Sequence, residues 1–371
     1  MNKKNEYNNK SEELLPSKLS KFHLQTYSGT PAGKIFANGK MQCGLKIIIL
    51  ATDDYNRIVK LTDEELDSIE LINMATGEKL SGEWSYSDVE NDYTHLYPSP
   101  YLDQSSQFSN SPPQDTDLDQ KKIYWVTSKQ IAELTIGAKF ILNKKTFKSP
   151  EGISIKAERP IIYSHKDIHK DSETSIKSGK YKIHKHVDKR TTNGHEMYDE
   201  DFYFPWSQTN HYYRIKYLIH DITIHDITIW DTREDKNKES PEYHKMAHLK
   251  YYANLHIWFL WGDFQDERTA GDIIDSTYKY EENLWNGMRT TTYTTRPQAK
   301  ITTTKDEAKG LISFSELCFE ANMKELWKET PEKENTANLK FHDEYGNESR
   351  TLRVEIKIED GQQIITFKNN I

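Results

Sequence analysis

Histidines next to aspartates are the residues of this sequence best suited to chemistry. Two consecutive copies of Ile-His-Asp-Ile-Thr place His220 and His225 five residues apart. An imidazole beside a carboxylate is a common arrangement in metal sites and in acid–base pairs. A strand alternates with a period of two, so a regular strand directs the two histidines to opposite faces, and only a bulge brings both to one metal. The alternative is a strand whose polar groups are satisfied on both faces.

More histidines lie in a basic segment, residues 165–190, which has eight lysines and arginines against four acids. Clustered lysines attract phosphate or an anionic glycan. A second interpretation is a transition-metal site, because His184 and His186 share a face if the segment is a strand. The third is a solvated loop, which the scarcity of apolar residues favours. We therefore predict a basic His-rich loop over residues 164–200. The candidate ligands of a transition metal are His184, His186, His220 and His225.

Complete catalytic and metal motifs are absent from the sequence. There is no nucleophile elbow, phosphate-binding loop, dinucleotide fingerprint or Cys-x-x-Cys pair. Residues 194–196 begin like a zinc-peptidase motif, but Asp199 stands where the second histidine is required. Alternating aspartates at 115–119 resemble the start of a calcium loop. Gln120 replaces the glycine of such a loop and Val126 replaces its glutamate, so calcium is not expected.

Aromatic residues make up 12% of the chain, while only 35% of all residues are hydrophobic. This mixture suits half-buried sheets, in which a ring covers one face and its polar tip reaches water. Exposed rings also stack on sugars and anchor protein interfaces. The candidate binding residues are Tyr212, Tyr213, Trp230, Trp258 and Trp261.

The elements that must position these residues are mainly strands. Residues 217–230 form the longest β-branched run and predict the central strand of an antiparallel sheet. Apolar residues alternate over 249–261 and predict one further strand. A capping box at Thr62 predicts one short helix, and a second at Ser313 favours a helix over 316–329. We predict a mainly β protein of antiparallel β-sandwich domains with a few short helices.

Two short stretches have a recognisable strand-turn-strand pattern. The residues concerned are Ala51, Asp53, Asn56 and Val59 in the first stretch, and 343–347 leading into 352–358 in the second. Both stretches resemble bacterial immunoglobulin-like domains of surface and adhesion proteins. The resemblance implies immunoglobulin-like β-sandwich domains, although the short helix expected after Thr62 departs from a plain sandwich.

Composition changes along the chain suggest its division into units. The first residues are rich in lysine, asparagine and serine, and a later Pro/Ser-rich stretch is typical of a long loop. The expected units are a flexible leader at 1–29, a β-sandwich domain at 30–163 with a long loop at 98–121, the basic loop at 164–200, and a β-rich domain at 201–371 that could divide near residue 296.

The net charge and the length of the apolar runs indicate which partners and which cellular location to expect for the protein. A formal net charge of -8 gives no overall signature of nucleic-acid binding. No run reaches the ~18 apolar residues of a membrane-spanning helix, and the first residues lack the apolar core of a signal peptide. We therefore expect a protein made in the cytosol, or exported without a cleaved signal peptide. Two distant cysteines, Cys43 and Cys318, form no disulfide framework.

The functional hypothesis is a non-catalytic binding or structural module that recognises a protein or a glycan and needs no cofactor. One alternative is a metal-dependent hydrolase that uses the His/Asp residues above. Another is a toxin or effector delivered without a signal peptide.

Overall fold

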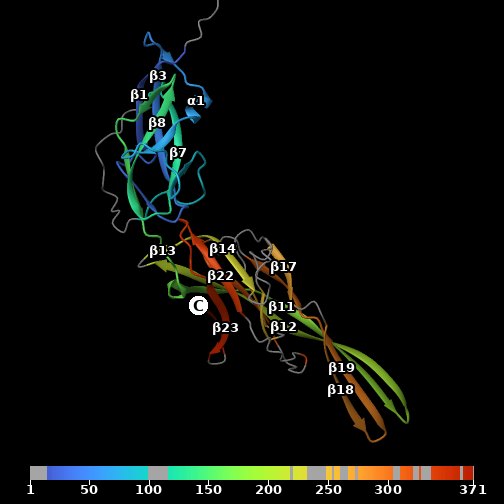
Figure 1. The fold of residues 1–371 in the computed structure, drawn as a ribbon. Helices are drawn as coiled ribbons and strands as arrows, with labels where there is room; N and C mark the ends of the chain where they lie inside the picture. The colour runs from blue at the N-terminus through green and yellow to red at the C-terminus, as the bar shows by residue number, and fades with distance from the viewer. Residues whose placement is uncertain are drawn as a thin grey trace, which may run out of the picture. The chain divides into compact units, whose positions relative to one another are not determined.

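The computed structural model describes residues 15–98, 116–217, 220–231, 248–252, 255–259, 266–271, 275–303, 310–320, 326, 336–359 and 362–370. The chain forms two compact units, one of residues 1–160 with 345–347 and one of residues 161–344 with 348–371. The prediction of a mainly β, antiparallel fold is confirmed (Figure 1). Within the described residues, no helix is long and apolar enough to cross a membrane.

The first unit consists of two sheets around a common core. One sheet has the order β1 (Lys18–Thr26), β3 (Cys43–Thr52), β7 (Gln120–Ser128) and β6 (Trp84–Ser87), with β4 (Ile58–Val59) beside β3. The other has the order β2 (Gly33–Phe36), β10 (Ile153–Glu158), β8 (Ala132–Leu142) and β5 (Glu70–Asn73), with β9 (Lys145–Lys148) beside β8. Only the β2–β10 pair among the described pairs is parallel. Apolar side chains of β3, such as Ile47 and Ile49, are fully buried in this unit.

The flexible leader predicted over residues 1–29 is wrong for its second half. β1 lies in this segment and pairs with β3 from Lys18 to Thr26. Its inward residues, Phe22, Leu24 and Thr26, are buried, while polar residues alternate with them. The alternation of buried and exposed positions is hard to recognise in the sequence of β1, because lysine, histidine and glutamine occupy the outward positions.

The short helix predicted after Thr62 is confirmed as α1 (Asp63–Asp67). The Thr62 hydroxyl accepts from the Glu65 amide, and the Glu65 carboxylate accepts from the Thr62 amide. This reciprocal cap satisfies two amide donors that have no partner inside the helix.

The described residues of the second unit form three sheets. The largest has the order β15 (His248–Tyr252), β16 (Leu255–Phe259), β21 (Ile312–Phe319), β12 (Gly194–Tyr217), β11 (Ile168–Thr191), β19 (Gly287–Thr295) and β18 (Ser276–Leu284), with β13 (His220–Ile222) beside β12. The second has the order β14 (Ile224–Asp231), β22 (Thr336–Asp343), β23 (Leu352–Glu359) and β24 (Gln362–Asn369). The third pairs β17 (Asp266–Gly271) with β20 (Gln298–Thr303). One 3-10 turn, η1 (His165–Asp167), precedes β11.

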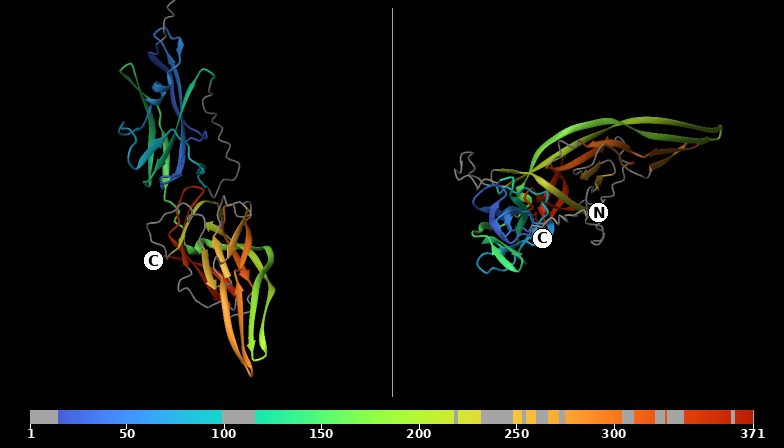
Figure 2. Two further views of the ribbon diagram at one scale, coloured as in Figure 1. Left: turned by 90° about the vertical axis from the view of Figure 1, so that its right-hand side faces the viewer. Right: turned by 90° about the horizontal axis from the view of Figure 1, so that it is seen from above.

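The basic loop predicted over residues 164–200 is instead a strand, a turn and the start of a second strand. β11 and β12 are 24 residues each and form one long antiparallel hairpin (Figures 1 and 2). Its inward positions, Tyr181, Ile183 and Val187, are buried, although lysines and histidines lie between them. His184 and His186 lie on the opposite face of the strand, and Lys185, on the same face as the buried residues, pairs with Glu200.

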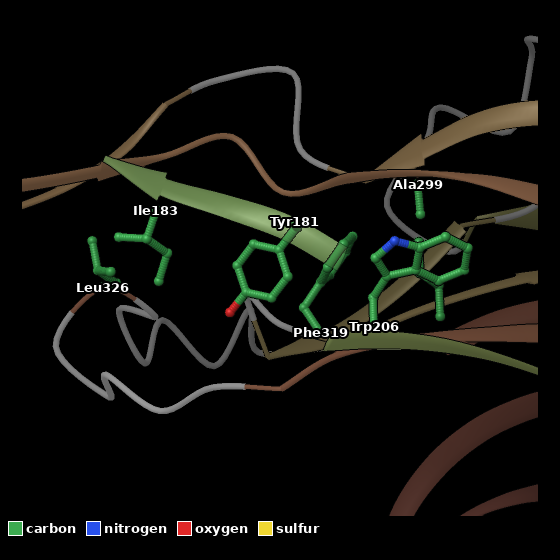
Figure 3. Close-up of a cluster of buried hydrophobic side chains, with 7 residues drawn as sticks. Tyr181, Ile183, Trp206, Ala299, Phe319 and Leu326 are labelled. Carbon is green, nitrogen blue, oxygen red and sulfur yellow. The ribbon is translucent and has the colours of Figure 1, made fainter. Parts of the chain in front are cut away.

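A hydrophobic cluster anchors the hairpin in the second unit (Figure 3). Tyr181 and Ile183 of β11 pack with Trp206 of β12 and Phe319 of β21. The Tyr181 hydroxyl donates to the Glu320 carbonyl over 2.5 Å, so the ring is buried without an unsatisfied polar group. The remaining buried members of the cluster are Ala299, Leu317 and Leu326.

The His-Asp repeat forms two strands of different sheets and no central strand. β13 pairs with β12, and β14 lies at the edge of its sheet. The pairing of β14 with β22 shifts register between Ile224 and Asp226, so His225 is the extra residue of a bulge. The extra residue lets isoleucines on both sides of the bulge, Ile224 and Ile227, point to the same buried face.

Two further element predictions are corrected. The single strand predicted over 249–261 is two shorter strands, β15 and β16, which pair with each other. The helix favoured over 316–329 is wrong where the chain is described, because β21 continues to Phe319 and pairs with both β12 and β16. Cross-strand pairing overrides the local capping signal at Ser313, whose residue lies inside β21.

Candidate recognition surface

Two hairpins form four neighbouring strands of the largest sheet, and these strands include residues 180–190 of the basic histidine segment. The strands have the order β12, β11, β19 and β18, and β11 pairs with β19 from Ile183 to Thr191 (Figures 1 and 2). We call this region the paired-hairpin sheet and define it as residues 180–191, 194–205, 276–284 and 287–295. Each side chain on it has a neighbour on the adjoining strand, which fixes two chemically different faces.

The turns of the two hairpins lie against each other. Each turn has two residues, 192–193 and 285–286, and each is followed by a glycine. The Thr192 amide donates to the Asn286 carbonyl over 2.9 Å. The end of the sheet is therefore a hydrogen-bonded double turn.

Glycine is required where the hairpins meet. Gly287 pairs with Thr191 of β11. A Cβ atom at Gly287 would lie 1.9 Å from the carbonyl oxygen of Arg190, which is far inside van der Waals contact. The absence of a side chain therefore permits the close approach of β19 to β11.

Apolar side chains are exposed at this end of the sheet. Trp285 in the turn is 94% exposed, and Met197 of β12 is 60% exposed. Met288 of β19 is also exposed. Single exposed apolar residues are common on protein surfaces. Tryptophan, however, is among the residue types most enriched in the hot spots of interfaces, and Trp285 is exposed at a turn.

One face of the sheet is a ladder of imidazoles and carboxylates, which we call the imidazole face. His184 Nδ1 lies 2.8 Å from Asp201 Oδ1, and His186 Nδ1 lies 2.7 Å from Asp199 Oδ1. The ladder also includes Thr292 and Thr294 of β19, which pair with the two histidines. The face offers imidazole, carboxylate and hydroxyl groups that can form hydrogen bonds with a ligand.

The carboxylates of the ladder are held in the ionised form. The hydrogen bond from His186 keeps the pKa of Asp199 below its usual value. The hydrogen bond from His184, followed by that from Lys182, lowers the pKa of Asp201. Each imidazole is therefore oriented by a charged partner on the neighbouring strand.

The opposite face carries rings around one lysine, and we call it the aromatic face. The Lys185 ammonium lies 5.7 Å from the ring centroid of Tyr198 and 5.6 Å from that of Phe202. It also lies 3.2 Å from the Glu200 carboxylate, a hydrogen bond that raises the lysine pKa. On the other two strands, Tyr280 stacks on Tyr293 at a centroid distance of 6.5 Å, and Tyr278 lies 6.0 Å from Tyr280. Such a face offers flat apolar surfaces with a cation among them.

The predicted metal ligands are only partly brought together. His184 and His186 share the imidazole face of β11, while His225 is exposed on β14 in another sheet. His220 lies in β13, and its side chain lies outside the described residues. Among the described residues, no group of three or more His, Cys, Asp or Glu side chains is arranged to hold a metal ion. The aspartates at 115–119 resemble the start of a calcium loop. Asp119 forms an ion pair with Lys21 over 2.7 Å, and Asp115 lies outside the described residues.

The predicted aromatic binding residues belong largely to other parts of the chain. Tyr212 and Tyr213 are 3% and 5% exposed, so they are core residues and their assignment to a surface is wrong. The Tyr212 hydroxyl accepts from Asn210 in a buried polar network, and Tyr213 packs edge-on against a ring of β24. Trp230 is half-buried on β14. The side chain of Trp258 in β16 and all of Trp261 lie outside the described residues.

Sequence reasoning missed Trp285 and the double turn. The available signal was an Asn-Gly dipeptide at 193–194 and again at 286–287, each between alternating segments. Asn-Gly is a strong local indicator of a hairpin. The pairing of the two hairpins has no such local signal, because it joins residues about a hundred positions apart.

No model of a known protein family matches the chain, and a search of curated proteins finds no match.

Proposed function

We propose that the chain is a non-catalytic recognition module that binds a protein or glycan surface through the paired-hairpin sheet. The observation that carries the proposal is Trp285, which is 94% exposed at a turn held by the Thr192–Asn286 hydrogen bond. An indole on a rigid support loses little conformational entropy on binding. It also supplies the large contact area that interface hot spots use.

The aromatic face supports the same function. Its rings lie on β12, β18 and β19, and Tyr198 and Tyr280 are exposed. Aromatic rings on a strand are held at fixed spacing by the backbone, so they present a preformed surface. Stacking on a sugar ring or on an apolar patch of a protein needs such preformed surfaces.

The hydrolase alternative draws less support from the same residues. The imidazoles of His184 and His186 hydrogen-bond to carboxylates across the strand pair. A metal would require a third ligand at the same point, and no suitable group lies among the described residues.

The proposal is tested by binding of the labelled full chain to glycan arrays and to arrays of cell-surface proteins. We expect Trp285→Ala to lower the signal at least tenfold for the proteins and uncharged glycans that bind the wild type. Tyr55→Ala is the matched control, because Tyr55 is an equally bare aromatic residue at 81% exposure in the first unit.

An equal signal from Trp285→Ala and the wild type contradicts the proposal. So does an equal loss in Tyr55→Ala, which would indicate a general effect of removing an exposed ring. Absence of binding on both arrays also contradicts it.

A further inference from the structure

A depression beside the imidazole face gathers cations from segments that are distant in the sequence. It has a volume of about 410 Å³, which suits one or two sugar rings. Strand β11 contributes one side of it, and the end of β19 with the start of β20 contributes another. The charged and polar side chains used below are Lys180, Lys182, His184, Asp275, Thr294 and Arg296.

The depression has a small excess of positive charge. Lys180, Lys182 and Arg296 line it, against the single carboxylate of Asp275. Asp201, outside the lining, lies 3.1 Å from the Lys182 ammonium. Three cations against two carboxylates leave one net positive charge, apart from any charge on His184.

The geometry leaves donors for a ligand. Arg296 donates its Nε to Asp275 over 2.8 Å, and this is its ion pair among the described residues. The terminal nitrogens of a guanidinium can still bind a carboxylate or sulfate in a bidentate manner. Lys180 forms no ion pair within the described part of the chain and is exposed. The Thr294 hydroxyl lines the same depression and can pair with a sugar hydroxyl.

We propose that this depression binds a sugar that carries a single acidic group, a carboxylate or a sulfate. The acidic group would bind Arg296 and Lys180, and the sugar hydroxyls would bind Thr294 and Lys182. This inference rests on the proposed recognition function and names the chemical class of one ligand.

The charge distribution favours one anion over a polyanion. Two carboxylates flank the cations of the depression, Asp275 beside Arg296 and Asp201 beside Lys182. A nucleic acid needs a continuous run of cations along its phosphates. The carboxylates interrupt any such run and repel a second anionic group.

The depression and the double turn are separate places on the sheet. His184 and Thr191, the last residue of β11, are seven residues apart on one extended strand, which corresponds to roughly 23 Å at about 3.3 Å per residue, and Thr192 of the double turn follows directly. Variants at one place therefore leave the other intact, and the two proposals can fail independently.

The test uses three matched saccharides: 3′-sialyllactose, lactose 3′-sulfate and uncharged lactose. Ligand-observed NMR titration of the full chain measures each affinity at low and at raised salt. We expect binding of at least one acidic saccharide and none of lactose. Arg296→Ala should weaken it tenfold or more and Lys180→Ala severalfold, because each removes a charge-assisted hydrogen bond. Arg350→Ala, an exposed arginine of the same unit outside the lining, should leave it unchanged.

Equal binding of lactose, absence of binding by both acidic saccharides, or full affinity in Arg296→Ala would overturn the inference. Tighter binding of a DNA duplex, with a steep dependence on salt, would overturn it in favour of a polyphosphate ligand. The variant Trp285→Ala should bind the acidic saccharide like the wild type. Failure of the saccharide test leaves the array test of Trp285 standing.

Discussion

At the scale of single residues, Gly287 decides how closely the two hairpins approach. Its missing side chain lets the backbone of β19 lie against the carbonyl of Arg190. The adjoining turn then presents Trp285 on a fixed support through the Thr192–Asn286 hydrogen bond. Gly287, which has no side chain, thus determines the position of Trp285, the residue that we expect to contact a partner.

The variant Gly287→Ala tests this role. A methyl group at 1.9 Å from the Arg190 oxygen forces the strands apart, at a cost of about 1–3 kcal/mol. Hydrogen exchange should become faster at the amides of Thr191 and Thr192, with the first unit unchanged. Asn283→Ala is the control, because Asn283 is an exposed residue of the adjoining strand β18. This substitution should leave hydrogen exchange at Thr191 and Thr192 unchanged. Unchanged protection in Gly287→Ala would show that the hairpins do not meet at this position.

The His–Asp pairs give a pH dependence whose sign follows from the lowered carboxyl pKa values. Asp199 and Asp201 are ionised above the ordinary aspartate pKa of about 3.9, and there the pairing stabilises the folded state in full. The stabilisation is lost as the pH falls through the lower pKa of the folded protein.

We expect His186→Asn to raise the pKa of Asp199 toward its ordinary value, because it removes the main hydrogen bond to that carboxylate. Carboxyl-carbon NMR titration of the wild type and the variant measures the change. The pKa of Asp188, which Arg190 lowers, is the internal reference and should stay constant. An Asp199 titration that is the same in both proteins would refute the pairing.

At the scale of elements, β11 shows what the sequence could and could not predict. The capping box at Thr62 predicts the helix α1 correctly, because this signal is local. β11 was taken for a loop, since its buried residues are separated by lysines and histidines. Its stability comes from pairing with β12 and β19, and these partners lie outside any local window. The possible common face of His184 and His186 was predictable, whereas their partners Asp199 and Asp201 were not.

The core position of β11 can be tested with Ile183, which is fully buried in the cluster of Figure 3. Ile183→Ala should lower the free energy of unfolding of the second unit by about 2–5 kcal/mol, through lost burial and a cavity. Ile162→Ala is the matched control in the same unit, because Ile162 is 63% exposed, and its effect should stay within about 0.5 kcal/mol. Chemical denaturation followed by circular dichroism measures both. Equal effects of the two substitutions would be inconsistent with β11 as a core strand.

At the scale of the whole molecule, each compact unit has a core of its own and contains one free cysteine. Cys43 belongs to the first unit and Cys318 to the second. Burial raises the pKa of the Cys43 thiol to about 12 and also raises that of Cys318. Thiolates, the reactive form, are therefore scarce in the folded chain near neutral pH.

The rate of thiol labelling should be lower in the folded chain than in the unfolded chain, because the folded chain has less thiolate. In denaturant, two thiols per chain should react with a disulfide reagent at the normal rate. In the folded protein at mildly alkaline pH, Cys43 should react roughly a hundredfold or more slowly, because its thiolate fraction is lower. Fewer than two thiols in the unfolded chain would indicate a disulfide, and fast labelling of the folded chain would contradict the burial of Cys43.

The immunoglobulin-like character that the resemblance of residues 51–59 and 343–358 implies remains a proposal for the β-sandwich domains. The central claim is that a partner contacts the double turn of the paired-hairpin sheet.

The most direct test of this claim is site-specific photo-crosslinking with a photoreactive phenylalanine at position 285, and at position 55 as control. The labelled full chains are irradiated on intact cells or glycoproteins to which the wild type binds. We expect a discrete crosslinked product from position 285 and none from position 55. Binding that persists without any crosslink from position 285, or with equal crosslinking from both positions, would contradict the account.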